Sequence, residues 1–320
     1  MNRSMQIVEV GPRDGLQNET APVPTAAKIA FVDALSFSGV SEIEVSAFVS
    51  PEWVPQLSDA ADVFNGIHRR AGVIYSALVP NRKGLDSALA AGVDKVAVFT
   101  AASETFNRKN INTSVAGSLK RFGPVVAAAG SAKLPVRGYV STAFWCAFEG
   151  RIAPPAVLSV VDRLVEIGIS EVAISDTIGK ASPDEVKRLL DLLLARHPVE
   201  RIAVHFHDTY GRGVANVLAA WSLGIRTVDA STGGLGGCPY APGASGNVAT
   251  QDVVAALEKQ GVVTGVDRQQ LTRARRHLDA YLEDDLRALP RDGSPACAAC
   301  QFSTGDVCCR RFQPDNTRVS

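Results

Sequence analysis

The sequence predicts an α/β fold, a closed TIM or (β/α)8 barrel with an additional C-terminal helix, from three observations. Short apolar runs rich in β-branched residues recur along the chain, helical patterns separate them, and several runs are apolar throughout instead of alternating. Continuous apolar runs are typical of parallel strands that helices cover on both faces. The expected strands are residues 5–10, 42–47, 73–79, 94–99, 135–141, 171–175, 202–206 and 226–230.

Helical patterns with start signals lie between these strands. The signals are Pro24–Thr25 before residues 26–39, Pro154–Pro155 before 156–168, and Ser182-Pro183-Asp184-Glu185 before 186–197. Proline is tolerated in a first helical turn because the N–H group it lacks has no partner there. Ser182 is a good N-cap residue, since its side chain can accept a bond from the first turn. A further charged helix is expected from residue 268 to about residue 287.

A single folded domain is expected, although a chain of 320 residues would on average hold two. Barrels of this kind use about 250 residues for one domain, and no internal repeat or linker divides the chain. We therefore expect one barrel domain over residues 1–290 and an irregular, cysteine-containing tail over 291–320. An open, doubly wound sheet is the alternative fold, but the turn at residues 11–15 lacks the Gly-x-Gly-x-x-Gly pattern of that fold.

Charge and hydropathy argue against two classes of partner. Lys plus Arg and Asp plus Glu both number 33, so nothing in the net charge favours nucleic acid or an anionic membrane. The first residues enter a strand-like run without the apolar stretch of a signal peptide. No run of about 18 apolar residues occurs either. We therefore expect a cytoplasmic protein.

The six cysteines are unevenly distributed, whereas a secreted disulfide framework would be spread through the fold. Four of them lie in the tail, at Cys297, Cys300, Cys308 and Cys309. Four thiolates could bind zinc, but their spacing does not match a zinc ribbon, and a mobile, oxidisable tail is the favoured interpretation. Cys146 lies in an apolar segment and is expected to pack in the core.

Polar side chains follow several of the expected strands. They are Arg13, Asp14 and Gln17 after the first, Glu44 on the second, Asp176 and Thr177 after the sixth, His205, His207 and Asp208 at the seventh, and the loop 233–247 after the eighth. Active sites of barrel enzymes lie at the carboxyl ends of the strands. These side chains are therefore the candidate functional residues.

The segment His205-Phe206-His207 indicates a metal site. Residues i and i+2 of a strand share a face, so both imidazoles can point to the barrel mouth while Phe206 packs in the wall. Asp14 and Asn247 are expected close by, because the first strand of a closed barrel adjoins the last. A hard nitrogen and oxygen ligand set suits Mg²⁺ or Mn²⁺. Two core histidines, and a turn-stabilising role for Asp14, are the alternatives.

The loop 233–247 is long, rich in glycine and carries Cys238 between a glycine and a proline. Its length and composition are typical of a lid that closes over a substrate. A thiol on a closing loop can deliver or accept a proton, and we favour this role over that of an inert cysteine.

These motifs resemble the hydroxymethylglutaryl-CoA lyase family, of the DRE-TIM metallolyase superfamily. The matching segments are VEVGPRDGLQNE (8–19), IEVSAFVSPEWVPQ (43–56), NRKNIN (107–112), YVSTAFWCAFEG (139–150), ISDTIG (174–179), HFHDTYGRG (205–213) and GGLGGCPYAPGASGNVATQD (233–252). They keep the family's order, extend over roughly residues 6–290 and include its cysteine-bearing loop. Two features depart from the family: Ala47 replaces a serine found in some members, and the tail after about residue 290 does not resemble it.

The resemblance implies a metal-dependent retro-Claisen cleavage of (S)-3-hydroxy-3-methylglutaryl-CoA to acetyl-CoA and acetoacetate, by a homodimer. It implies metal ligation by Asp14, His205, His207 and Asn247, support from Glu44, enolate stabilisation by Arg13, substrate orientation by Asp176, proton transfer by Cys238, and contacts from Arg108, Lys109 and Asn110 to the CoA end. The base that takes the hydroxyl proton is left open between His205 and Asp14.

Three rival functions are weighed. A Claisen-condensing isopropylmalate or homocitrate synthase would carry Gly-Glu-Arg-x-Gly-Asn in the last loop, where this chain has Gly-Gly-Cys-Pro-Tyr at 236–240. An aldolase of the same superfamily is disfavoured in the same way, and nothing supports a binding barrel without turnover. A lyase for a longer 3-hydroxy-3-alkylglutaryl-CoA is not distinguished by the sequence.

Overall fold

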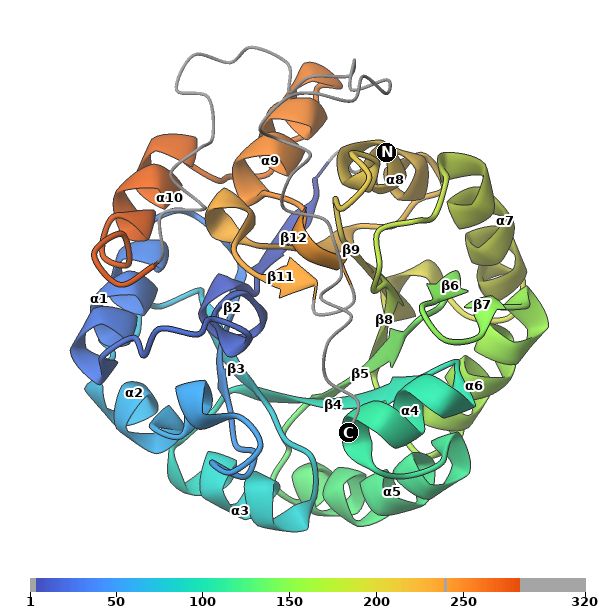
Figure 1. The fold of residues 1–320 in the computed structure, drawn as a ribbon, viewed down its shortest axis with the longest axis horizontal. Coiled ribbons are helices and arrows are strands. Elements are labelled where there is room, and N and C mark those ends of the chain that lie inside the picture. The colour runs from blue at the N-terminus through green and yellow to red at the C-terminus, as the bar shows by residue number, and fades with distance from the viewer. Residues whose placement is uncertain (1–3, 239–240, 283–320) are drawn as a thin grey trace, which may run out of the picture. The chain divides into compact units, whose positions relative to one another are not determined.

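The computed structural model describes residues 4–238 and 241–282, with side chains given outside 237–245. Its compact unit ends at Leu282. In this unit eight parallel strands close into a barrel in the order β1-β10-β9-β8-β5-β4-β3-β2, and helices surround it (Figure 1). The predicted barrel is therefore confirmed. The tail and its four cysteines lie outside the described residues.

The barrel strands coincide with the eight predicted runs to within a few residues. They are β1 (Gln6–Glu9), β2 (Glu42–Ala47), β3 (Ile74–Leu78), β4 (Lys95–Ala101), β5 (Val136–Ser141), β8 (Glu171–Asp176), β9 (Ile202–Phe206) and β10 (Thr227–Ala230). β1 pairs with both β2 and β10, so the first and last strands are neighbours as expected. Residues far apart in the sequence therefore meet at one seam of the barrel.

The helices are α1 (Thr25–Leu35), α2 (Ala60–Gly66), α3 (Arg82–Ala90), α4 (Glu104–Ile111), α5 (Val115–Ser131), α6 (Pro154–Glu166), α7 (Pro183–Leu194), α8 (Gly213–Ser222), α9 (Thr250–Lys259) and α10 (Arg268–Arg275). No helix in the described part of the chain is long and apolar enough to cross a membrane. The C-terminal helix is shorter than predicted. After Arg275 the backbone bonds join residues three apart, as in Leu278 N–H to Arg275 O, so the α-helix gives way to tighter turns.

The amino end of the barrel is closed by buried charges instead of apolar side chains alone. Lys95, the first residue of β4, lies 2.9 Å from Glu42 and 3.2 Å from Glu171, which begin β2 and β8. Arg137 of β5 also pairs with Glu171, at 2.9 Å. Buried charges are tolerated only when paired, so these contacts tie four strands together.

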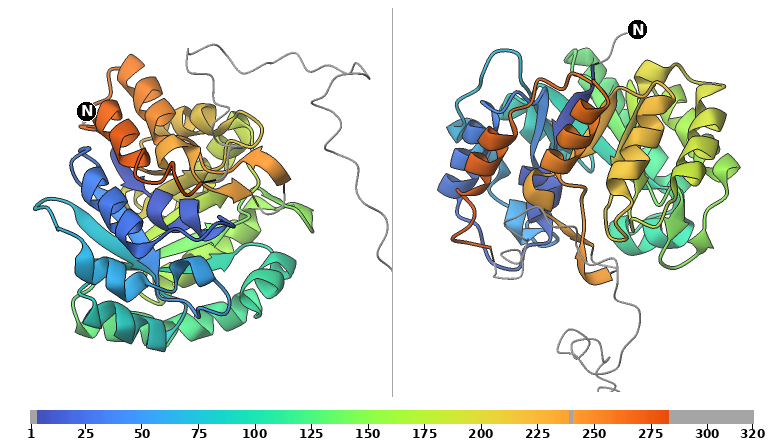
Figure 2. Two further views of the ribbon diagram at one scale, coloured as in Figure 1. Left: turned by 60° about the vertical axis from the view of Figure 1, so that its left-hand side comes forward. Right: turned by 90° about the horizontal axis from the view of Figure 1, so that it is seen from above.

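Two hairpins extend the carboxyl end of the barrel (Figure 2). They are formed by β6 (Trp145–Cys146) with β7 (Gly150–Arg151), and by β11 (Gly237–Cys238) with β12 (Ala241–Ser245). The second hairpin is anchored to the barrel where the backbones of His207 and Asn247 form a bridge. The glycine-rich loop therefore returns directly to the end of β9.

The start of α7 shows how sequence signals set a helix boundary. The Ser182 hydroxyl accepts a bond from the Glu185 N–H, and the Glu185 carboxylate accepts one from the Ser182 N–H. This capping box satisfies two donors that have no partner within the helix.

We expect Ser182→Ala to lower the free energy of unfolding by about 1 kcal/mol, because it removes the N-cap acceptor. Urea denaturation followed by circular dichroism measures the change. Ser87→Ala is the matched control, since Ser87 is exposed inside α3 and its hydroxyl bonds only to the carbonyl of Lys83. Equal midpoints for the two variants would show that the cap contributes nothing.

Candidate metal centre and active site

A tight turn after β1 positions the first two candidate residues. In the single π-helical turn η1 (Gly11–Gly15), the carbonyl of Val10 accepts bonds from three successive N–H groups, those of Arg13, Asp14 and Gly15. Gly15 is required here, because a Cβ atom would lie 2.8 Å from the Cβ of Leu235. The turn therefore presents Arg13 and Asp14 together at the carboxyl end of the barrel.

Arg13 is buried and paired on two sides. Its Nε lies 2.6 Å from the Glu44 carboxylate, and another guanidinium nitrogen lies 2.5 Å from Asp14 Oδ1. The guanidinium also lies over the ring of Tyr139, 5.5 Å from its centre. A guanidinium is planar and has several N–H donors, so two carboxylates can hold it in one orientation. A lysine amine could not be fixed in this way. Glu44 thus holds Arg13 in place, and its predicted role in supporting the site stays a prediction.

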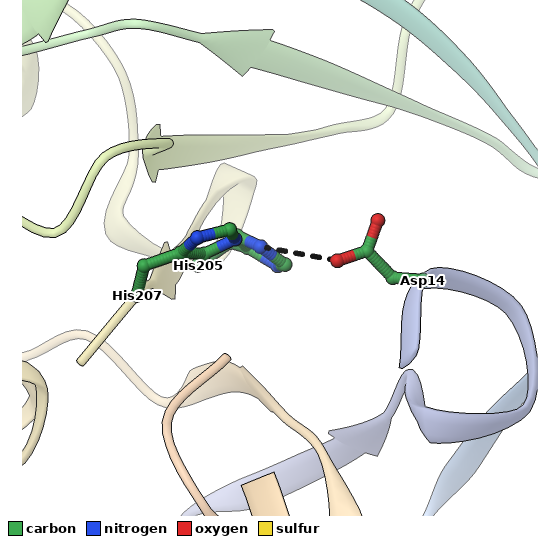
Figure 3. Close-up of side chains that lie close together, drawn as sticks. All are labelled: Asp14, His205 and His207. Carbon is green, nitrogen blue, oxygen red and sulfur yellow. Dashed lines mark ion pairs between the residues drawn. The ribbon is translucent and has the colours of Figure 1, made fainter. Parts of the chain in front are cut away.

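The two histidines lie together opposite Asp14 (Figure 3). His205 lies near the end of β9, and His207 follows the strand. Both are buried, and the centres of their rings lie 5.4 Å apart. One ligand atom from each histidine and one from Asp14 all lie within 4.8 Å of one another. Opposite ligands of a Mg²⁺ ion lie about 4.2 Å apart, since each bond is about 2.1 Å long. The cluster thus has the size of a divalent-cation site.

The charge state of this cluster also suits a cation. Burial raises the pKa of Asp14, but Arg13 and the two imidazoles outweigh burial and hold that pKa well below its usual range. Burial, and next the neighbouring His205 imidazole, lower the pKa of His207 to about 4. At neutral pH Asp14 is therefore an anion and His207 a neutral ring, which are the protonation states that ligate metals.

Asn247 joins this cluster from the last loop. Its side-chain amide donates to Asp14 Oδ2 at 2.9 Å and to the carbonyl of Leu235 at 3.1 Å. Both donors are thereby used, while Asn247 Oδ1 is buried and has no hydrogen-bond partner among the described residues. Gly236 leaves room for this arrangement, because a Cβ atom there would lie 2.7 Å from the amide nitrogen.

Within this cluster, two buried atoms therefore have no hydrogen-bond partner among the described residues, Asn247 Oδ1 and His207 Nδ1. Leaving such atoms unpaired in a folded protein is costly, and a bound ion is one of the ways to satisfy them. Their neighbours are an ionised carboxylate and a second imidazole. The residues present thus fit a divalent cation with mixed nitrogen and oxygen ligands.

A cleft of about 700 Å³, partly open to solvent, lies over this cluster. Its lining residues are Arg13, Asp14, Gln17, Asn18, Phe99, Phe106, Asn110, Tyr139, Ser141, Ser175, Thr177, His205 and His207. Most are polar, and Phe99 and Phe106 form a tilted pair with ring centres 6.5 Å apart. The cleft can therefore hold a polar substrate against a small apolar wall.

Asp176 does not line the cleft, although Ser175 and Thr177 on either side do. Its Oδ2 accepts the Ala181 N–H at 2.8 Å, and its Oδ1 is buried with no partner among the described residues. Burial raises the pKa of Asp176 to about 7. Its predicted role in orienting the substrate stays a prediction.

The three residues predicted to meet CoA are placed differently from one another. Asn110 lines the cleft. The Arg108 side chain is 69% exposed and lies 3.8 Å from Glu104, while the Lys109 amine lies 4.8 Å from the centre of the Phe148 ring. All three belong to α4, so the basic pair adjoins the cleft without lining it.

The two cysteines at 146 and 238 differ in what the structure shows of them. The backbone of Cys238 pairs with Ala241 in the β11–β12 hairpin, and its side chain lies outside the described residues. The predicted proton-transfer role of this thiol therefore stays a prediction. Cys146 is buried with its sulfur 3.1 Å from Ser103 Oγ, which confirms the predicted packing role.

Three residues of the site were not predicted from the sequence. Asp229 of β10 lies 3.2 Å from His205 Nδ1, Arg137 of β5 pairs with Asp229 at 2.6 Å, and the ring of Tyr139 lies edge-on to His205. The feature of the sequence that could have indicated Asp229 is a charged residue inside an otherwise apolar strand, in Thr-Val-Asp-Ala at 227–230. Such a residue either faces solvent or needs a buried partner, and the sequence does not indicate which.

Fold and site together define the class: an α/β-barrel protein with a candidate divalent-metal centre and a buried arginine at the carboxyl ends of its strands. The HMGL-like family model matches residues 4–278. The chain belongs to this family.

Similar proteins agree with this assignment. The rat protein named 3-hydroxy-3-methylglutaryl-CoA lyase, cytoplasmic, is 50% identical over 270 residues, which cover 84% of this chain and 79% of the relative. The crystal structure of the HMG-CoA lyase from Brucella melitensis matches with a TM-score of 0.85 and 48% identity, covering 87% of this chain and 98% of that one. An HMG-CoA lyase from Acinetobacter baumannii in complex with coenzyme A and 3-methylmalate matches with a TM-score of 0.83 and 39% identity, covering 92% and 98%.

We expect His207→Ala to weaken Mn²⁺ binding by more than about 100-fold, because losing only an outer partner of a ligand already costs roughly 10-fold to 100-fold. Electron paramagnetic resonance of the free ion measures the affinity, and circular dichroism checks the fold. His277→Ala is the control, because His277 is exposed and distant in sequence from the cluster. Unchanged affinity in the His207 variant would remove that residue from the ligand set.

Proposed function

We propose that the chain is a hydroxymethylglutaryl-CoA lyase, which cleaves (S)-3-hydroxy-3-methylglutaryl-CoA to acetyl-CoA and acetoacetate. The observation that carries the proposal is the placement of buried Arg13 directly beside the Asp14, His205 and His207 cluster in one cleft. A retro-Claisen cleavage needs a polarised hydroxyl and a stabilised enolate side by side. Similarity to a lyase of this name, with 50% identity over 270 aligned residues, supports the choice of substrate.

Asp14, His205, His207 and Asn247 would hold the divalent ion, and their donor atoms favour Mg²⁺ or Mn²⁺. When bound, such an ion supplies a Lewis acid that lowers the pKa of the substrate hydroxyl and attracts its carboxylate. Asp14 is suited to ligation and is a weak base, because Arg13 and the imidazoles keep its pKa low even though burial opposes them. His205 is the other candidate base. Its Nε2 lone pair could either bind the ion or accept the hydroxyl proton.

Arg13 would stabilise the enolate. As the C2–C3 bond of the substrate breaks, negative charge moves onto the thioester oxygen. The Arg13 guanidinium stays charged at any working pH, is held by Glu44 and Asp14 before the substrate arrives, and is itself buried. A donor that needs no reorganisation during the reaction stabilises the transition state most effectively.

Cys238 would complete the reaction by protonating the enolate carbon, which yields acetyl-CoA. Its place in a glycine-rich hairpin anchored beside His207 supports this role, because closure of that loop would bring the thiol toward the cleft and exclude water. Asp176 would orient the substrate from the end of β8.

The CoA end would extend along α4. Asn110 lines the cleft and the basic side chains of Arg108 and Lys109 adjoin it, as the CoA phosphates require. The similar lyase solved with coenzyme A supports this class of ligand. We also propose a homodimer, a single lyase domain over residues 1–290 and a cytoplasmic location, the last because a similar rat lyase is named cytoplasmic.

Acetoacetate release tests the function. We expect turnover of the 3-methyl thioester in the presence of Mg²⁺ and none after chelation and dialysis, because the hydroxyl then loses its activation. The same assay with longer 3-alkyl homologues defines the substrate range. Binding of the thioester without any acetoacetate release, with metal present, would replace the lyase by a binding barrel.

We expect Arg13→Met to lower kcat by about 100-fold or more, the usual effect of losing one oxyanion donor. Steady-state kinetics on the thioester substrate and Mn²⁺ titration give the comparison. Arg82→Met is the control, because Arg82 pairs only with Asp86 on the surface of α3. A variant that raises KM with unchanged kcat would show that Arg13 binds the ground state instead.

We expect Cys238→Ser to retain Mn²⁺ and substrate binding but to reduce turnover by about 100-fold or more, the usual scale of general acid-base catalysis. The background variant replaces Cys297, Cys300, Cys308 and Cys309 by Ser. In that background Cys238 should react with a thiol reagent and be protected by a substrate analogue with Mg²⁺. Near-normal turnover of Cys238→Ser would assign the proton step to a bound water.

A further inference from the structure

Behind the candidate metal site lies a buried carboxylate that the proposed reaction does not use. Asp229 occupies β10 directly beside His205 of β9, and the two residues are partners in the register of these parallel strands. The Asp229 Oδ2 atom lies 3.2 Å from His205 Nδ1, on the side of the ring away from Asp14. Asp229 is 1% exposed, so water does not compete for this contact.

Arg137 holds this carboxylate in place. Its guanidinium lies 2.6 Å from Asp229 Oδ1 and 2.9 Å from Glu171 at the start of β8, and Arg137 itself is 1% exposed. The ring of Tyr139 lies 5.1 Å from the guanidinium and edge-on to His205. A buried guanidinium and a tyrosine ring therefore restrict both the carboxylate and the imidazole.

These contacts determine which nitrogen of His205 carries the proton. A carboxylate paired with a guanidinium is ionised and can only accept hydrogen bonds. The Asp229 carboxylate is paired in this way with Arg137, at 2.6 Å. The Nδ1 atom must therefore be the donor toward Asp229, which leaves the Nε2 atom with a lone pair on the side of Asp14.

We propose that Asp229, held by Arg137, is a positioning residue that fixes the Nδ1–H tautomer of His205 and so presents its Nε2 lone pair to the Asp14 and His207 cluster. A partner on the far nitrogen of an imidazole fixes the ring's orientation and raises its basicity as a ligand. The proposal rests on the proposed metal centre and adds a residue that contacts neither ion nor substrate.

The tautomer is tested on the unaltered protein. Long-range proton–nitrogen correlation spectra of ¹⁵N-histidine-labelled protein, saturated with Mg²⁺, distinguish the two ring nitrogens, and His205→Gln assigns the signals. We expect His205 to carry its proton on Nδ1 alone. A proton on Nε2 overturns the proposal, whatever any variant does. This measurement also detects a positioning role that a loss of stability alone would not reproduce.

The second test is Mn²⁺ affinity of Asp229→Asn, measured by electron paramagnetic resonance with circular dichroism as the check on folding. The side chain keeps its shape but loses its charge and can donate to Nδ1, so we expect binding 10-fold to 100-fold weaker, as for other outer partners of ligands (~1.4–2.7 kcal/mol). Asp162→Asn is the matched control, because it breaks a similar pair of 2.8 Å to His197 outside the cleft.

The outcomes separate this proposal from the function on which it rests. If the unaltered protein binds no Mn²⁺, the metal centre itself is wrong. If the unaltered protein binds Mn²⁺ and a folded Asp229→Asn variant binds it equally well, only the role of Asp229 is overturned. If that variant does not fold, the tautomer seen in the unaltered protein decides.

Discussion

The structure depends on how the barrel pairs the charges that it buries. Arg13 lies between Glu44 and Asp14, and Arg137 lies between Asp229 and Glu171, all inside a ring of parallel strands. An unpaired buried charge would cost several kcal/mol. Each guanidinium is therefore committed to its carboxylates, and the side chains of the site are held in place before any ligand arrives.

Closure of the barrel makes this pairing possible. Because β1 adjoins β10, Asp14 of the first turn reaches Asn247 of the last loop, and because β10 adjoins β9, Asp229 reaches His205. Inside the barrel Tyr139 packs against small side chains from three other strands, Ala97 of β4, Ala173 of β8 and Ala203 of β9. Both guanidinium groups contact the Tyr139 ring, with Arg13 5.5 Å and Arg137 5.1 Å from its centre.

The two ends of the barrel differ in how completely their buried polar groups are paired. The amino end of the barrel holds ion pairs such as Lys95 with Glu42, whereas the candidate metal cluster at the carboxyl end holds polar atoms with unused hydrogen-bonding capacity. Asn247 Oδ1 and His207 Nδ1 are the clearest cases in the described part of the chain. Both atoms lie in the cluster that the proposed ion would occupy, where a ligand could satisfy them.

The sequence alone determined the barrel, its eight strands and the His205, His207 and Asp14 cluster, because strand periodicity and the position of polar residues after strands are local signals. Tertiary structure decided the rest. The helix α10 ends at Arg275, and the charge pattern of the sequence does not reveal the turns that follow it. Only the fold shows that Asn110 lines the cleft whereas Arg108 does not. The pairing of His205 with Asp229 and Arg137 needs the register of three strands, which depends on contacts between residues that are far apart in the chain.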